Sequence, residues 1–237
     1  NLEEYQNDAN PRDKDTDDDG LFDGWEVDNS LEPDDGTGDN GASGDPDGDS
    51  LTNIDEYNNN ADPQDSDTDD DGMPDGWEVT NSLEPDDATG DNGASGDPDE
   101  DSLTNLEEYQ AGTDPQGNDH DDDGMKDGWE VDNGLNPLSA ADALLDPDTD
   151  GLDNLGEHDN NTDPNDADTD DDLMPDGWEV DNLLLLTFNN ANSDAEGDCL
   201  TDLEEYQNNT DPRDDDSDGD GLPDGWEVHN SLEPDDD

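Results

Sequence analysis

The sequence predicts an irregular tandem repeat in which acidic loops are each followed by a short α-helix, with little or no β-structure and no conventional hydrophobic core. The chain has 80 Asp and Glu residues against 4 Lys and Arg, which gives a net charge of -76. Leu, Ile, Val and Phe supply only 30 of its 237 residues, a share at which a highly charged chain is expected to stay unfolded without other support. The five tryptophans recur at intervals of 52, 52, 49 and 48 residues, which indicates internal repetition.

A second set of positions follows the same period. The same four intervals separate Tyr5, Tyr57, Tyr109, His158 and Tyr206. We therefore interpret the chain as one tandem array of units of about 48–52 residues. The five units cover approximately residues 1–44, 45–96, 97–145, 146–193 and 194–237.

Each unit contains a twelve-residue loop of the kind seen at Asp15–Glu26, DTDDDGLFDGWE, which we call the Trp-type loop. Carboxylates stand at positions 1, 3, 5, 9 and 12 and glycine at position 6. Ca2+ binds six to eight oxygens at about 2.3–2.6 Å, and such spacing supplies them, with a backbone carbonyl at position 7 and both oxygens of the final Glu. The predicted ligands in the Trp-type loops are Asp15, Asp17, Asp19, Leu21, Asp23 and Glu26; Asp67, Asp69, Asp71, Met73, Asp75 and Glu78; Asp119, Asp121, Asp123, Met125, Asp127 and Glu130; Asp168, Asp170, Asp172, Met174, Asp176 and Glu179; and Asp216, Asp218, Asp220, Leu222, Asp224 and Glu227.

A second loop, the Tyr-type loop, precedes the tyrosine of each unit and follows the same pattern. Asp45–Glu56 reads DPDGDSLTNIDE, with Asn at position 9. The predicted ligands in these loops are Asp45, Asp47, Asp49, Leu51, Asn53 and Glu56; Asp97, Asp99, Asp101, Leu103, Asn105 and Glu108; Asp146, Asp148, Asp150, Leu152, Asn154 and Glu157; and Asp194, Glu196, Asp198, Leu200, Asp202 and Glu205. The chain thus has nine complete loops, and residues 1–4 match the end of a tenth.

The connecting segments are of two kinds. The closing Glu of a Tyr-type loop lies 11 residues before the next Trp-type loop every time, whereas the reverse connection spans 19, 19, 16 and 15 residues. We expect a short helix over 52–58 in the first kind, ending before Asp62-Pro63 because proline disfavours helix in the preceding residue. A similar helix over 23–29 is expected at the start of the second kind, before a Gly-, Asp- and Asn-rich loop.

Hydrophobic burial alone cannot fold this chain. Ordering costs on the order of 1.5 kcal/mol per residue, and about 25 cal/mol per Å2 over so few apolar side chains falls short of that. A divalent cation would both neutralise the carboxylates and cross-link the backbone. The sequence therefore predicts a calcium-stabilised elongated rod with about nine to ten or more Ca2+ ions per chain.

The repeated pattern LTNLEEYQ..TDP...DTDDDG[LM]PDGWEV resembles the thrombospondin type 3 repeat family and its bacterial and archaeal relatives with EF-hand-like loops. The resemblance covers essentially the whole chain. It implies a chain wrapped around a series of calcium ions and a structural role in extracellular or cell-surface proteins. Leu173 departs from the pattern at the glycine position of its loop, and Ser50, Ser102 and Cys199 make the Tyr-type loops weaker matches.

Other classes of function fit less well. His120, His158 and His229 occupy distant slots of the repeat without a nucleophile pattern, so we predict no enzyme activity, and a single cysteine, Cys199, excludes an internal disulfide. The fixed place of the tryptophans favours packing over carbohydrate binding. The negative charge argues against nucleic acid. The longest apolar run, at 183–186, is too short to insert into a membrane.

The sequence favours a structural rod in an extracellular or cell-surface filament, surface layer or stalk. Because the chain begins inside one loop and stops inside a connector, we expect it to continue or to be completed by a neighbouring copy, as in self-assembly. The candidate contact residues are Leu183, Leu184, Leu185, Leu186 and Phe188. Two alternatives stay open: a calcium-dependent linker array in a larger secreted enzyme or adhesin, and an acidic calcium buffer or mineral-associated polyanion.

Overall fold

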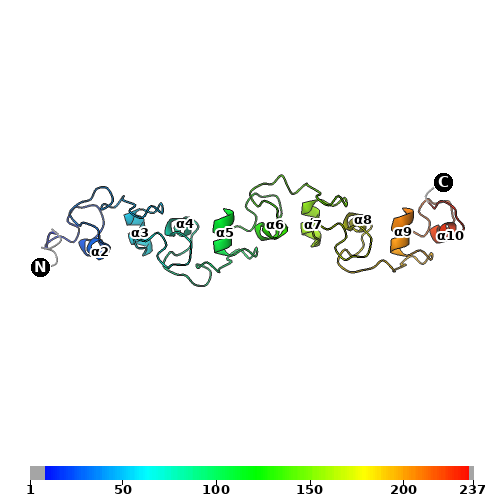
Figure 1. Ribbon diagram of the computed structural model, residues 1–237, viewed down its shortest axis with the longest axis horizontal. Coiled ribbons are helices and arrows are strands. Elements are labelled where there is room, and N and C mark those ends of the chain that lie inside the picture. The colour runs from blue at the N-terminus through cyan, green and yellow to red at the C-terminus, as the bar shows by residue number, and fades with distance from the viewer. Residues whose placement is uncertain (1–8, 235–237) are drawn as a thin grey trace. The chain divides into compact units, whose positions relative to one another are not determined.

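The predicted alternation of acidic loops and short helices is confirmed in the computed structural model, which describes residues 9–234. This range contains nine α-helices of six or seven residues and no β-strand (Figure 1). Helices begin alternately 22 and 26 to 30 residues apart. They are α2 (Asp23–Asp28), α3 (Asn53–Asn59), α4 (Asp75–Thr80), α5 (Asn105–Ala111), α6 (Asp127–Asn133), α7 (Asn154–Asn160), α8 (Asp176–Asp181), α9 (Asp202–Asn208) and α10 (Asp224–His229). The partial tenth loop at 1–4 lies outside the described residues.

Two compact units make up the chain, Asn1–His120 and Asp121–Asp237. Each contains the same alternation of loop and helix. The third Trp-type loop spans the division between them. The local descriptions below therefore apply within each unit.

Each helix begins at position 9 of its loop, so its first turn is part of the loop. In the Tyr-type loops a Thr or Asp caps the helix: Thr104 and Glu107 form a reciprocal capping box at α5, and the Thr52 hydroxyl accepts a hydrogen bond from the Asp55 amide at α3. Such caps satisfy amides that have no partner inside a helix. The α3 helix ends at Asn60, which adopts a left-handed φ of 62°, a common way of ending a helix.

The apolar core is divided into small clusters beside the loops. The position-7 side chains Leu21, Met73 and Met174 are completely buried. Each tryptophan that has a following aromatic in the repeat packs edge-on or tilted against it, as Trp25 does on Tyr57 with ring centroids 5.3 Å apart. The other pairs are Trp77 with Tyr109, Trp129 with His158, and Trp178 with Tyr206. These contacts agree with the packing role predicted for the tryptophans.

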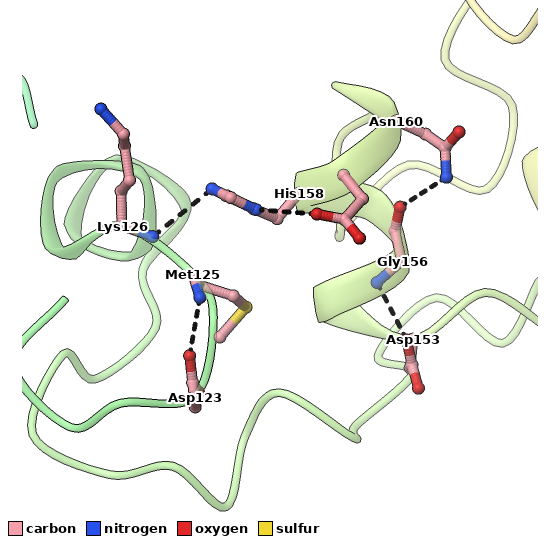
Figure 2. Close-up of polar contacts among 8 residues, drawn as sticks. Asp123, Met125, Lys126, Asp153, Gly156, His158 and Asn160 are labelled. Atoms are coloured by element: carbon pink, nitrogen blue, oxygen red, sulfur yellow. Dashed lines mark hydrogen bonds and ion pairs between the residues drawn. The ribbon is translucent and has the colours of Figure 1, made fainter.

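His158 replaces the tyrosine of the other units without disturbing this packing. Its ring lies 5.1 Å from that of Trp129, and Nε2 accepts a hydrogen bond from the Lys126 backbone at 3.4 Å (Figure 2). The other ring nitrogen faces Asp159 at 3.6 Å. The contacts are those of a packing residue.

Consecutive loops are fastened to each other through the carboxylate at position 5. Asp49 Oδ2 accepts a hydrogen bond from the Gly76 amide of the next loop at 2.6 Å. The same contact joins Asp150 to Gly177 at 2.6 Å. In the other kind of connection, Asp19 Oδ2 accepts from an amide of the following connector, that of Ala42, at 2.6 Å. A loop is therefore attached to the segment that follows it by one of its own predicted ligands.

Glycine at position 10 of the Trp-type loop permits this close approach. A Cβ atom added to Gly76 would lie 2.4 Å from the carbonyl oxygen of Asp49, and one added to Gly225 would lie 2.3 Å from that of Asp198. No side chain fits at such distances without a backbone shift. The second helical residue of the Trp-type loop therefore has to be glycine where a preceding loop packs against it.

We predict that Gly76→Ala destabilises the folded protein by about 1–3 kcal/mol, the usual cost of overpacking. Gly24→Ala is the matched control, because the same DGWE context there has no described atom within 4 Å of the added Cβ. The Gly24→Ala substitution should leave the stability of the fold unchanged or raise it by up to about 1 kcal/mol, because alanine has the higher helix propensity. Thermal unfolding of both variants checks this, and equal midpoints would contradict the proposed loop contact.

No helix within residues 9–234 has the length and apolar character needed to cross a membrane.

Candidate metal centres

Every loop turns at two left-handed positions. In the first loop Asp18 at position 4 has φ 63° and Gly20 at position 6 has φ 107°, and all nine loops repeat this pair of positive φ values. Glycine takes such angles without steric cost, and Asp takes them more readily than most other residues. The sequence indicated the turn at position 6 but not that at position 4. The available signal was the abundance of Asp and Gly at position 4.

Leu173 occupies position 6 of its loop without changing the turn. It adopts φ 78°, and its amide donates to Asp168 Oδ2 at 2.8 Å, as the Gly72 amide does to Asp67 Oδ2 at 3.0 Å. A left-handed leucine costs roughly 1–2 kcal/mol. The departure from the sequence pattern is therefore accommodated as strain while the loop geometry is retained.

The two turns bring the carboxylates of positions 1, 3 and 5 together. In these groups one oxygen from each Asp lies within 4.8 Å of the others. The groups include Asp15, Asp17 and Asp19; Asp45, Asp47 and Asp49; Asp67, Asp69 and Asp71; and Asp97, Asp99 and Asp101. The predicted ligands at positions 1, 3 and 5 are therefore brought together.

The position-5 carboxylate is held in place by the main chain of its own loop. Its Oδ1 accepts a hydrogen bond from the amide at position 7, as Asp49 does from Leu51 at 2.7 Å and Asp123 does from Met125 at 2.9 Å (Figure 2). In these two loops position 7 is thus fixed by its amide on one side and by its buried side chain on the other. A predicted carbonyl ligand at this position lies on a rigid part of the loop.

The position-12 glutamates are among the most deeply buried charged side chains. Glu26, Glu56, Glu78 and Glu205 are completely buried, and neither carboxylate oxygen of these four has a hydrogen-bond partner among the described residues. The position-3 carboxylates of the same loops also have at least one buried oxygen without a partner. An uncompensated buried carboxylate is costly, so these oxygens indicate a positive ligand.

Burial and like charges act on the same glutamates. Burial, followed by repulsion from Asp17 and Asp19, raises the pKa of Glu26 to about 8. Burial, followed by repulsion from Asp69 and Asp71, raises the pKa of Glu78 to about 9. Without a cation, these side chains hold a proton at neutral pH. With a divalent cation beside them, the same groups would be ionised.

The residues at position 9 have a different environment from the rest of the predicted set. Both oxygens of Asp75 accept hydrogen bonds from Thr68 at position 2, one from its amide at 2.8 Å and one from its hydroxyl at 2.7 Å. In the Tyr-type loop, the Asn53 amide group donates to the carbonyls of Asp39 and Gly41, both at 2.9 Å. Position 9 therefore also holds other backbone segments in place, the start of its own loop in the Trp-type and the preceding connector in the Tyr-type.

The donor set fits a hard divalent cation. Carboxylate and carbonyl oxygens are the ligands preferred by Ca2+, Mg2+ and Mn2+, whereas softer metals prefer nitrogen or sulfur. The residues of one loop that could hold the ion are the carboxylates at positions 1, 3, 5 and 12 and the carbonyl at position 7. The ion would supply two positive charges to a cluster in which the pKa of the final Glu is raised by burial and neighbouring carboxylates.

Comparison of the chain with protein-family models, with curated proteins and with solved structures returns no match. The resemblance to thrombospondin type 3 repeats stays a prediction. The loop geometry carries the functional argument.

The predicted contact surface at 183–188 precedes the loop that contains the single cysteine. Leu183, Leu185 and Phe188 are exposed to 74%, 64% and 68%. Cys199 is a free, exposed thiol whose backbone takes the left-handed turn at position 6 of its loop. The role of the apolar segment as a contact surface stays a prediction.

We predict opposite pH dependences with and without the ion. In the metal-free fold the pKa of Glu78 is about 9, above its ordinary value of 4.5, so the folded chain binds more protons than the unfolded chain between these values. The stability of the metal-free fold therefore falls as pH rises through this window. Ion binding requires the ionised form, so apparent calcium affinity should rise over the same range.

Circular dichroism of the dialysed, metal-free chain should show more helix at pH 5 than at pH 8. Calcium titrations at pH 6 and pH 8 should give the tighter midpoint at pH 8. A midpoint that does not change with pH, together with helix content that increases with pH in the metal-free chain, would contradict the assignment of the glutamates as ligands.

Proposed function

We propose that this chain is a structural calcium-binding repeat protein in which each loop holds a Ca2+ ion that takes the place of a hydrophobic core. The observation that carries the proposal is the burial of the closing glutamates without hydrogen-bond partners, for example Glu56, beside other carboxylates of the same loop. Ca2+ is favoured among hard cations because a twelve-residue loop ending in a potentially bidentate Glu suits its higher coordination number.

The composition of the interior supports a structural role for the ions. Within the described residues, 23 polar or charged residues are buried against 14 hydrophobic ones. Nine bound Ca2+ ions would add 18 positive charges and leave a net charge of -58. An ion present at a hundred times its dissociation constant stabilises the folded state by about 2.7 kcal/mol per site. Several such sites together would match the stability of an ordinary domain.

The repetition of the loops favours a structural role over catalysis. The connectors at 29–47 and 81–99 differ at one residue, Gly36 against Ala88. Because the predicted ligands occupy the same positions in every unit, the chain has many equivalent sites and none that stands out as an active site. We therefore propose a role in an extracellular or cell-surface filament, surface layer or stalk, where calcium is abundant. The elongated rod and self-assembly expected from the sequence stay predictions.

Removal of calcium should unfold the chain. We predict that a chelator at pH 7.5 lowers the helical signal in circular dichroism and increases the hydrodynamic radius, because uncompensated carboxylates repel one another. Magnesium should restore the structure less well, since it prefers a smaller octahedral shell. Unchanged helix content and radius after chelation would contradict the proposal. Weak, graded binding without any ordering of the chain would favour the calcium-buffer alternative.

A further inference from the structure

The carboxylate at position 9 of the Trp-type loop lies beside the preceding loop. Gly76, the next residue after Asp75, donates its amide to Asp49 Oδ2 at 2.6 Å. A Cβ on Gly76 would meet the Asp49 carbonyl oxygen at 2.4 Å and the Leu51 amide nitrogen at 3.3 Å. Asp75 is therefore fixed against positions 5 to 7 of the loop at 45–56, and it is completely buried there.

Charge interactions follow the same geometry. Burial is the main cause that raises the pKa of Asp75 to about 6, hydrogen bonds from Thr68 oppose the rise, and the largest like charges acting on it are Asp49 and Asp47. In the reverse direction, the Asp75 carboxylate is among the charges that, after burial, raise the pKa of Glu56 to about 8. Asp75 and Glu56 belong to different loops but share one electrostatic environment.

This arrangement recurs at two further joints of the same type, those that follow the loops at 146–157 and 194–205. The Gly177 amide donates to Asp150 Oδ2, and the Gly225 amide donates to Asp198 Oδ2. The position-9 residues just before these glycines, Asp176 and Asp224, are completely buried. Each glycine would also bring an added Cβ within 2.6 Å of the carbonyl oxygen of the preceding loop. The contact is therefore a property of the repeat.

Two of the three preceding Tyr-type loops lack a carboxylate at their own position 9, while the third has Asp202 there. In the first two, Asn53 and Asn154 occupy the position, and their amide groups donate to carbonyls of the preceding connector. The closing glutamates Glu56 and Glu157 are completely buried, and neither carboxylate has a hydrogen-bond partner in the part of the chain that the structure describes. These buried glutamates indicate a cation, but the loop around each of them has one carboxylate fewer than a Trp-type loop.

We propose that three position-9 aspartates, Asp75, Asp176 and Asp224, each serve the calcium site of the Tyr-type loop before them, and so complete the sites closed by Glu56, Glu157 and Glu205. This inference rests on the proposed calcium binding and deepens it. Each Tyr-type site is then built from two consecutive loops. Calcium in that site fastens the short connection between them.

The test follows calcium binding to each loop separately in the full chain. Backbone amide signals in nuclear magnetic resonance report each loop: Gly48 lies in the loop at 45–56, and Gly72 lies in the loop at 67–78. Asp75→Asn should raise the calcium concentration at the Gly48 midpoint about tenfold or more, since the number of ligand charges sets affinity. The Gly72 midpoint should change less than threefold.

Thr68→Val is the matched control, because it removes the hydroxyl bonded to Asp75 while keeping the charge of Asp75. It should leave the Gly48 midpoint within threefold. Asn has the same shape as Asp and its oxygen can still accept from the Thr68 amide, and circular dichroism of Asp75→Asn in calcium checks that the variant folds. Asp224→Asn gives an independent second case, read at Gly197 for the preceding loop and Gly221 for its own.

A shift confined to Gly72, equal shifts at both amides, or no shift at either would overturn this inference and leave calcium binding itself intact. For Asp224→Asn, a shift confined to Gly221, equal shifts at Gly197 and Gly221, or no shift at either would overturn the inference independently. If neither amide of the unaltered chain responds to calcium, the proposed function fails and this inference fails with it.

Discussion

The structure depends on bringing carboxylates together in loops that have far too few basic side chains to neutralise them. The chain has 80 acidic residues and only 4 Lys and Arg, so ion pairs within the protein cannot balance the clusters. The loops at 15–26, 45–56, 67–78 and 97–108 instead each hold three Asp oxygens within 4.8 Å of one another and bury a glutamate beside them. Left-handed turns at positions 4 and 6 and the hydrogen bond from position 7 all serve this convergence.

The same side chains also join one loop to the next. Asp49 uses one oxygen within its own loop and the other on Gly76 of the following loop. Asp19 divides its oxygens in the same way between Leu21 and Ala42. Under the proposed function, loading one site would order the carboxylate that holds the neighbouring segment. Nearest-neighbour coupling of this kind is typical of repeat proteins, whose stability is a sum over units and interfaces.

Much of this arrangement could be predicted from the sequence because the loop and helix signals are local. Spacing of carboxylates identified each loop, and the start of each helix follows from the loop itself. The long-range contacts could not be predicted. Asp75 reads as one more ligand of its own loop, yet its backbone neighbour packs on Asp49, 27 residues before Gly76. From the sequence, Gly76 is only a residue of low helix propensity. The reason for glycine there, the nearby Asp49 carbonyl, is evident only in the structure.

The apolar residues have a secondary role. Buried leucine and methionine at position 7 and the Trp–Tyr pairs form separate clusters, each next to a loop. They orient the loops but are too few to order the chain alone. Amide hydrogen exchange at position 7, for example at Leu51 and Met73, tests the dependence on cations most directly. We expect protection of about a hundredfold or more in calcium and near-unfolded exchange after its removal, since local opening sets the rate. Equal protection in both conditions would contradict the account.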